Sequence, residues 1–168
     1  MTGWGKLALE IRDYDNPETV RARKYATGAQ LLSAVRVPEV GRTTREVVWE
    51  KNRAKVYRYE PAREREPPVP VLLVYALILR PYILDLVPGN SFVEHLVGEG
   101  FDVYLLDWGI PEEEDEGLSF EHLTLDYLPE AVKSVLWNSG TEGLSLFGYC
   151  QGGTIAAMYA SLFPNEVS

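Results

Sequence analysis

The sequence is poor in the residues that several classes of protein need. It contains one cysteine, Cys150, so it can form neither an internal disulfide nor a cluster of cysteine metal ligands, which favours an intracellular protein. Lys and Arg number sixteen against twenty-five Asp and Glu, so we expect no binding to nucleic acid through its phosphates. The longest apolar run, residues 69–79, is too short to span a bilayer, and residues 1–6 lack the apolar core of a signal peptide. These absences predict a soluble, cytoplasmic protein.

What is present is the composition of an ordinary globular domain. Apolar residues make up 46% and charged residues 24% of the 168 residues, which predicts one domain or one domain with a small appendage. The charge is uneven: residues 1–66 carry fourteen basic and ten acidic side chains, whereas residues 67–168 carry two and fifteen. A helix start signal at Pro17 and scattered apolar positions predict a helical segment over residues 1–40, followed by a partial α/β core over residues 41–168.

From residue 44 onward the pattern predicts strands that alternate with helices. Residues 47–59 predict a hairpin that turns around residues 51–53. Apolar runs predict buried strands at residues 69–75, 102–107 and 143–149, and helices at residues 92–99, 123–137 and 154–163. This alternation is typical of βαβ units, so we expect an α/β fold with a mostly parallel sheet and the hairpin at one edge. Pro129 either kinks the second helix or marks its first turn, and residues 111–117 predict a solvated acidic loop.

The strongest local signal is an apolar strand that runs into Gly-Tyr-Cys-Gln-Gly-Gly and then into an alanine-rich helix. This is the nucleophile-elbow pattern of an α/β-hydrolase fold, with Cys150 in the place that serine usually holds. So sharp a turn strains its middle residue and leaves no room for side chains at the flanking positions, which explains Gly148 and Gly152. Gly153 is the third glycine of the predicted elbow. The N-terminal end of the following helix would stabilise a thiolate, and the backbone N–H of Gln151 could donate to a developing oxyanion.

This segment has two other interpretations. A lone cysteine is often a small buried hydrophobic residue rather than a nucleophile. A Rossmann phosphate loop is also glycine-rich, but the spacing fits Gly-x-Gly-x-x-Gly poorly, and the segment follows the third predicted buried strand rather than the first. The flanking glycines, the strand before them and the helix after them favour Cys150 as a nucleophile.

At these residues the sequence resembles the polyhydroxyalkanoate synthase family, whose lipase-like box has this form. The resemblance extends over roughly residues 40–165 and includes the segments 44–49, 55–59, 70–78, 80–86 and 100–109. The short N-terminal region and the sequence Asp-Trp-Gly are most similar to the class III type, whose catalytic subunit works with a second, non-catalytic subunit. One position departs from the family: Leu79 stands where asparagine is common, in a loop that would help to build the oxyanion site.

The resemblance implies an acyltransferase that polymerises 3-hydroxyacyl-coenzyme A into polyhydroxyalkanoate through a thioester on Cys150. It implies no cofactor and no metal, because the coenzyme A thioester is the substrate. The implied partners are a second, non-catalytic synthase subunit or a second copy of the chain, and the surface of a polyester granule in the cytoplasm. Two alternatives stay open: a cysteine-elbow hydrolase of esters or lactones, and a non-catalytic module that binds a granule or a subunit.

A nucleophile on this fold needs an acid and a histidine that follow it in the chain. The eighteen residues after Cys150 contain neither His nor Asp. His95 and His122 precede the elbow: we predict His95 to be a surface or core-edge residue of a helix, and His122 to pair with carboxylates. Asp107 and Asp85 are predicted to support or order loops. The triad acid and histidine are therefore not identified in this sequence.

The same reasoning predicts an incomplete sheet. A sheet that ends just after the elbow helix would leave the strand at residues 143–149 as an unpaired apolar edge, which favours aggregation or pairing with another chain. We therefore expect the N-terminal part of an α/β-hydrolase fold, from a truncated or incomplete synthase, that is not a competent enzyme by itself.

Overall fold

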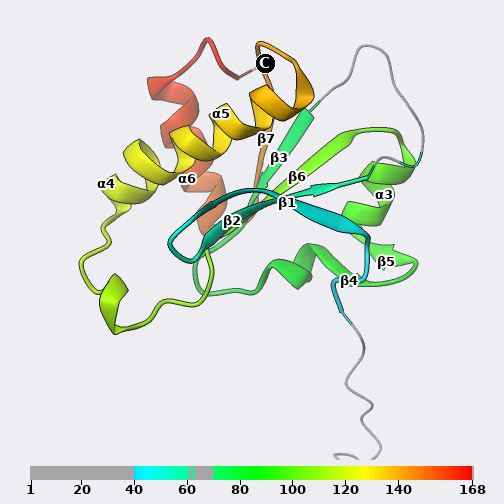
Figure 1. Ribbon diagram of the computed structural model, residues 1–168, viewed down its shortest axis with the longest axis horizontal. Helices are drawn as coiled ribbons and strands as arrows, with labels where there is room; N and C mark the ends of the chain where they lie inside the picture. The colour runs from blue at the N-terminus through cyan, green and yellow to red at the C-terminus, as the bar shows by residue number, and fades with distance from the viewer. Residues whose placement is uncertain (1–39, 61, 63–69, 168) are drawn as a thin grey trace, which may run out of the picture. The chain divides into compact units, whose positions relative to one another are not determined.

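The computed structural model describes residues 40–60, 62 and 70–167, and its centre is a five-stranded sheet (Figure 1). In order across the sheet, the strands are β1 (Arg45–Lys51), β2 (Ala54–Tyr59), β6 (Asp102–Asp107), β3 (Pro70–Val74) and β7 (Ser145–Gly148). β3 pairs in parallel with β6 and β7, whereas β2 pairs antiparallel with β1 and β6. Of these five strands β2 alone runs against the others, so the predicted α/β fold with a mostly parallel sheet is confirmed. The helical segment predicted over residues 1–40 lies outside the described residues, apart from residue 40.

The hairpin of β1 and β2 forms one edge of the sheet, as the sequence predicts. Its turn contains Asn52 at a φ of 51°, a left-handed conformation that asparagine tolerates better than most residues. The register between the two strands shifts between Val47 and Trp49. The other strand of the hairpin, β2, contacts β6, so the antiparallel pair is joined to the parallel part of the sheet.

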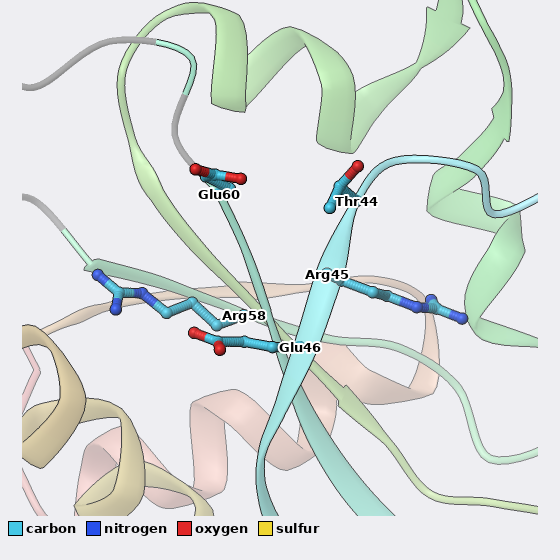
Figure 2. Close-up of a pocket in the computed structure, with 5 residues that line it drawn as sticks. All are labelled: Thr44, Arg45, Glu46, Arg58 and Glu60. Atoms are coloured by element: carbon cyan, nitrogen blue, oxygen red, sulfur yellow. The ribbon is translucent and has the colours of Figure 1, made fainter.

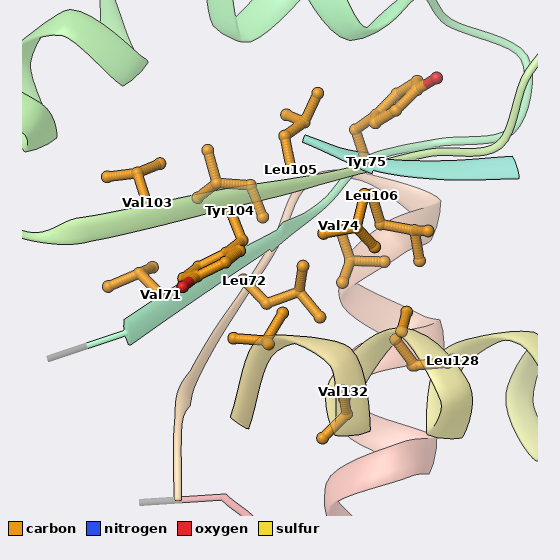
Figure 3. Close-up of a cluster of buried hydrophobic side chains, with 14 of the residues drawn as sticks. Val71, Leu72, Val74, Tyr75, Val103, Tyr104, Leu105, Leu106, Leu128 and Val132 are labelled. Atoms are coloured by element: carbon orange, nitrogen blue, oxygen red, sulfur yellow. The ribbon is translucent and has the colours of Figure 1, made fainter. Parts of the chain in front are cut away.

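The centre of the sheet is its most apolar part. Every residue of β3 is buried, and β6 is buried along its length except at its last residue, Asp107. Helix α5 (Leu128–Ser139) covers one face of these strands. Figure 3 shows Leu72 and Val74 of β3 on the side of the sheet that faces Leu128 and Val132 of α5. The continuous apolar pattern of the two strands therefore reflects burial on both faces.

Helix α3 (Phe92–Gly98) lies on the opposite face from α5. Its first residue, Phe92, contacts Phe147 of β7 with the ring centroids 4.7 Å apart. Ser91 begins this helix, because its side chain accepts a hydrogen bond from the backbone N–H of Glu94. Short elements precede α3 in the chain: η1 (Pro81–Leu84), β4 (Asp85–Val87) and β5 (Asn90–Ser91).

The helix predicted at residues 123–137 begins earlier and is not uniform. It consists of α4 (Phe120–His122), a π-helical turn η3 (Leu123–Tyr127) and α5, while the loop before it contains the short helix η2 (Glu113–Asp115). Pro129 lies in the first turn of α5, where its missing N–H does not disrupt the helix. Pro129 thus marks the first turn of α5, whereas the helical segment as a whole begins earlier, at Phe120.

Helix α6 (Gln151–Leu162) follows β7 directly and starts three residues before the predicted Thr154. The strand β7 lies at the edge of the sheet opposite the hairpin. Its edge is not wholly open, because Leu144, just before β7, forms a parallel bridge with Val167, and its N–H donates to the carbonyl of Glu166 at 3.0 Å. Among the described residues no helix combines the length and hydropathy that crossing a membrane requires.

Candidate active site

Cys150 occupies the sharp turn between β7 and α6. Its φ is 56° and its ψ is −125°. Of the described residues other than glycine, Asn52 and Cys150 are the two with positive φ. The Cys150 thiol is free and the residue is exposed. A sparsely populated backbone conformation at an exposed nucleophilic residue indicates a functional site, because the surrounding structure must hold the strain in place.

Two glycines beside Cys150 are required by contacts with backbone atoms. A Cβ atom on Gly152 would lie 2.1 Å from the carbonyl oxygen of Val74, at the end of β3. A Cβ atom on Gly148 would lie 2.3 Å from the Cα of Gly153. Gly153 itself is less restricted, since its Cβ would meet the Gly148 carbonyl oxygen at 3.4 Å. The elbow therefore depends on the absence of side chains at Gly148 and Gly152, whereas at Gly153 a small side chain meets only an ordinary contact.

Two backbone N–H groups at the start of α6, those of Gly152 and Gly153, have acceptors in the turn that precedes the helix. The N–H of Gly152 donates to the carbonyl of Tyr149 at 3.0 Å, and the N–H of Gly153 donates to that of Cys150 at 2.9 Å. Gln151 is the first residue of the helix, where an N–H has no acceptor one turn earlier. The oxyanion role that the sequence suggests for this N–H stays a prediction.

The loop after β3 lies against the elbow. The N–H of Tyr149 donates to the carbonyl of Val74 at 2.8 Å, which fixes the end of β7 to the end of β3. The chain then turns, and the N–H of Leu79 donates to the carbonyl of Ala76 at 3.2 Å. The Leu79 side chain is half-buried and packs against the hydrophobic core. Leu79 therefore contributes packing to the loop.

A hydrogen-bond network joins the carboxyl ends of β3 and β6. The Tyr75 hydroxyl donates to Oδ1 of Asp107 at 2.8 Å, and the N–H of Gly109 donates to the same oxygen at 2.9 Å. The indole Nε1 of Trp108 donates to the carbonyl of Tyr75 at 3.0 Å. Burial, together with the adjacent Asp107 carboxylate, raises the pKa of Tyr75, so its hydroxyl stays neutral and donates. These contacts agree with the loop-ordering role predicted for Asp107.

Sequence reasoning did not single out Tyr75 or Trp108 as individual residues of this site. Each directly follows a buried strand, Tyr75 after β3 and Trp108 after β6. In α/β folds the residues just beyond the carboxyl ends of parallel strands form the ligand crevice. That position is the signal by which both residues could have been found.

Neither histidine before the elbow forms part of this arrangement. His95 is an exposed residue in the last turn of α3, as predicted. His122 is exposed, and its Nδ1 contacts the N–H of Ser119 at 3.1 Å and the hydroxyl of Ser119 at 2.9 Å. The prediction that His122 pairs with carboxylates is therefore wrong. Its position as third residue of a short helix lets it complete a capping box instead.

Asp85 is a buried carboxylate with a structural role. Its oxygens accept hydrogen bonds from the N–H and hydroxyl of Thr43, at 3.1 and 2.7 Å, and from the hydroxyl of Ser91 at 2.7 Å. These bonds tie the segment before β1 to β4 and to the start of α3. Every one of them satisfies a carboxylate that would otherwise be buried without a partner.

The acidic loop is ion-paired rather than only solvated, which corrects the expectation from sequence. Arg53, in the hairpin turn, contacts three of its carboxylates: Glu112 and Glu114 at 2.7 Å each, and Asp115 at 2.8 Å. The N–H of Glu112 donates to Asp115, and this bond, together with Arg53, lowers the pKa of Asp115. The pairing joins segments about sixty residues apart in the chain, so no local pattern could indicate it.

Two cavities differ in their position relative to the elbow. One, of about 420 Å³, is lined by Thr44, Arg45, Glu46, Arg58 and Glu60. Figure 2 shows the Arg45 side chain pointing away from Glu46 and Arg58, which lie together on the other side of β1 and β2. This cavity is at the amino end of β6, because Arg58 pairs with Tyr104, and so it is at the opposite end of the sheet from Cys150.

The second cavity, of about 170 Å³, is lined mainly by apolar side chains, among them Leu77, Trp108, Leu123 and Tyr127. It lies at the carboxyl ends of β3 and β6, which is the same end of the sheet as the elbow. Within the described ranges no group of three or more His, Cys, Asp or Glu side chains is arranged to hold a metal ion.

Comparison with known proteins first defines the class. The family model described as "alpha/beta hydrolase fold" matches residues 69–168, more than half of the chain. Epoxide Hydrolase A from Mycobacterium thermoresistibile superposes with a TM-score of 0.52 at 19% identity, over 74% of this chain and 36% of that one. The chain therefore belongs to the α/β-hydrolase family.

Closer relatives define its place within that class. The model described as "Poly-beta-hydroxybutyrate polymerase (PhaC) N-terminus" matches residues 14–96. The Poly(3-hydroxyalkanoate) polymerase subunit PhaC of Haloferax mediterranei is 47% identical over 163 residues, which are 96% of this chain and 32% of that protein. The subunit of the same name from Synechocystis sp. is 41% identical over 146 residues, 86% of this chain and 39% of the relative.

The chain is thus similar, over nearly its whole length, to the N-terminal portion of poly(3-hydroxyalkanoate) polymerases. This confirms the resemblance found in the sequence. The chain spans 32% and 39% of the lengths of these two relatives.

Proposed function

We propose that this chain carries the nucleophile of an acyltransferase that polymerises 3-hydroxyacyl-coenzyme A into polyhydroxyalkanoate. The observation that carries the proposal is the exposed Cys150 at a φ of 56° between β7 and α6. The similarity to poly(3-hydroxyalkanoate) polymerases supports the substrate class. A cysteine suits this chemistry, because exchange between two thioesters is close to neutral in energy and leaves the acyl group activated.

The acylation step follows from the geometry of the elbow. The Cys150 sulfur, as a thiolate, attacks the thioester carbonyl carbon and forms a tetrahedral oxyanion. The Gln151 N–H donates to that oxyanion, and the N-terminal end of α6 favours the negative charge. The bond between this carbon and the coenzyme A sulfur then breaks, and coenzyme A leaves as a thiolate that takes up a proton. In the next step the hydroxyl of another acyl unit attacks the Cys150 thioester, an ester bond forms, and the Cys150 sulfur is released.

The second step needs a base to remove the proton of the attacking hydroxyl. The eighteen residues after Cys150 supply neither His nor Asp, His95 is an exposed residue of α3, and His122 contacts Ser119. We therefore expect these 168 residues alone to accept one acyl group and not to turn over. We further propose that catalysis takes place at a cytoplasmic granule surface, with a second, non-catalytic subunit or a second copy of the chain as partner.

The test is to incubate the chain with 3-hydroxybutyryl-coenzyme A and to follow the mass of the intact protein and the release of free coenzyme A. We expect one acyl group per chain, one equivalent of coenzyme A, and no adduct on the Cys150→Ala variant. Equal acylation of Cys150→Ala would contradict the proposal.

The same experiment separates the alternative functions. Free 3-hydroxybutyrate in excess over the protein would indicate that water takes the acyl group, as in a hydrolase. A wild-type Cys150 that iodoacetamide alkylates but the thioester does not acylate would indicate a binding module, and would overturn the transferase proposal.

A further inference from the structure

The carboxyl end of β3 is held by a buried hydroxyl. Tyr75, the residue after β3, is 1% exposed, and its hydroxyl donates to Oδ1 of Asp107 at 2.8 Å. A buried tyrosine hydroxyl needs such a partner, because it loses its bonds to water on folding. Asp107 is the last residue of β6. This bond therefore joins the carboxyl ends of two adjacent parallel strands, at the end of the sheet where Cys150 lies.

Tyr75 is also held through its backbone. Its carbonyl accepts the indole N–H of Trp108 at 3.0 Å. From the other direction Gly152 of α6 packs so closely that a Cβ there would lie 2.9 Å from the Tyr75 carbonyl carbon. Asp107 in turn accepts the N–H of Gly109 at 2.9 Å. Helix α6 and the chain after β6 thus both contact the backbone of Tyr75.

The loop that begins immediately after Tyr75 is where an oxyanion site on this fold finds its second donor. The first donor is the N–H after the nucleophile, here Gln151, and the second is an N–H in the loop that follows this strand. Ala76, the next residue, is fully buried and starts the turn that Leu79 closes. Tyr75 is therefore the last residue with a side-chain anchor before the N–H groups that could face the oxyanion.

We propose that Tyr75 is a positioning residue, which through its hydrogen bond to Asp107 sets the place of the loop that completes the oxyanion site for acylation of Cys150. The inference rests on the proposed role of Cys150 as the acylated nucleophile. An oxyanion donor acts only when it lies within hydrogen-bond distance of the developing charge, so a small displacement of the loop reduces the rate.

The chain contains a matched control for this bond. Tyr104 in β6 is fully buried, and its hydroxyl donates to Oδ2 of Asp102 at 2.9 Å. Burial and the carboxylate raise the pKa of Tyr104, as they raise that of Tyr75. In both pairs a buried tyrosine donates to a carboxylate, but Asp102 is itself buried and also pairs with Arg58. Asp102 begins β6 and lies at the end of the sheet away from Cys150.

The experiment measures two reactions of Cys150 in the Tyr75→Phe and Tyr104→Phe variants. Acylation by p-nitrophenyl acetate passes through a tetrahedral oxyanion, whereas alkylation by iodoacetamide does not. For Tyr75→Phe we expect acylation to slow by about tenfold or more, since loss of a whole oxyanion donor costs about 10²–10³ in rate, and alkylation to stay within about twofold. For Tyr104→Phe we expect both rates to stay within about twofold.

Two variants of the acceptor guard against a folding defect in Tyr75→Phe. Asp107→Asn keeps an Oδ1 that can accept from Tyr75 and Gly109, so we expect it to retain most of the acylation rate. Asp107→Ala removes the acceptor, and we expect it to slow acylation selectively. Unchanged acylation in both Tyr75→Phe and Asp107→Ala, or an equal fall of acylation and alkylation in these two variants, would overturn the inference.

The outcomes also separate this inference from the proposed function. If p-nitrophenyl acetate acylates wild-type Cys150 but 3-hydroxybutyryl-coenzyme A does not, the proposed substrate is wrong and the role of Tyr75 is still decided by its variants. If neither reagent acylates Cys150 although iodoacetamide alkylates it, both conclusions fall.

Discussion

The two ends of β6 hold similar tyrosine–carboxylate pairs in different surroundings. At the amino end, Arg58 forms a bidentate contact with Asp102, at 2.9 and 3.3 Å, and its guanidinium lies 5.7 Å from the centre of the Tyr104 ring. At the carboxyl end, Asp107 accepts from the hydroxyl of Tyr75 and the N–H of Gly109. Within the part of the chain that the structure describes, no Lys or Arg forms a salt bridge with Asp107.

We call the amino end of β6 the scaffold end, and the end that carries the proposed nucleophile Cys150 the reactive end. At the scaffold end, charged side chains hold the strands together, and a cavity with both signs of charge lies beside them. At the reactive end, neutral donors and close backbone contacts hold the ends of β3 and β6, and the strained residue Cys150 is exposed. The ion pairs of Arg53 at this end join the hairpin turn to the acidic loop. Fixed backbone contacts are suited to a site that must keep its geometry while charge develops in it. The predictions below test whether the two ends can be disturbed separately.

The largest expected effect is on stability at the reactive end. In Gly152→Ala the new methyl group would lie 2.1 Å from the carbonyl oxygen of Val74, which cannot move without disturbing β3. We expect the free energy of unfolding to fall by about 3 kcal/mol or more, measured by urea unfolding. The matched control is Gly98→Ala in α3, where, apart from the neighbouring backbone of its own helix, no described heavy atom lies within 4 Å of the added methyl group.

Gly98→Ala should leave the unfolding midpoint unchanged or slightly raised, because alanine is the better helix former. An equal loss of stability in the two variants would show that the tight contact at Gly152 has no special effect.

A smaller effect is expected at the scaffold end. Among the described side chains, Arg58→Ala leaves the Tyr104 hydroxyl as the remaining donor to Asp102, which is 5% exposed. We expect a loss of about 1–3 kcal/mol in unfolding free energy, with the rates of acylation and alkylation of Cys150 unchanged. Lys55→Ala serves as control, because the pair of Lys55 with Glu50 is exposed and 3.6 Å long. A fall in acylation in Arg58→Ala would mean that the two ends are coupled.

The smallest expected effect is a pH dependence at the acidic loop. The pKa of Asp115 is lowered in the folded chain from its usual 3.8, by the N–H of Glu112 and by Arg53. A lowered folded-state pKa contributes stability that is present above pH 3.8 and is lost as the pH falls through the folded value. The difference in urea midpoint between wild type and Asp115→Asn should therefore be small at pH 7 and disappear in acid. A difference that grows as the pH falls would contradict this assignment.

The sequence predicts the parts of this fold that depend on local pattern. The runs that form β3 and β6 are apolar because both faces are buried, and Gly148 is required by its contact with Gly153 in the same turn. The contact that excludes a side chain at Gly152 is instead with Val74, at the end of β3. Contacts between distant segments are not predictable in this way. The pairing of Arg53 with the acidic loop depends on how the hairpin turn lies against a segment about sixty residues later.

In the candidate site, too, the residues of a local motif are predictable from sequence and the contacts between distant segments are not. Cys150, Gln151 and the glycines stand in one short motif and can be found from spacing alone. The bond from Tyr75 to Asp107 spans 32 residues and exists because β3 and β6 are neighbours in the sheet. The role predicted for His122 was wrong because the capping position of a three-residue helix decides its partner.

The π-helical turn η3 changes the direction in which the side chains of the following helix point. The buried side chains there include a series at every fourth residue, Leu123, Tyr127, Ala131 and Val135, beside the buried Thr124, Leu128 and Val132. In a regular α-helix each residue advances about 100°, so twelve residues overshoot three full turns by about 120° and the last side chain would leave the sheet. One extra residue accommodated in a wide turn removes about 100° of that excess. The extra residue in the π-helical turn thus keeps Leu123 and Val135 on nearly the same side of the helical segment.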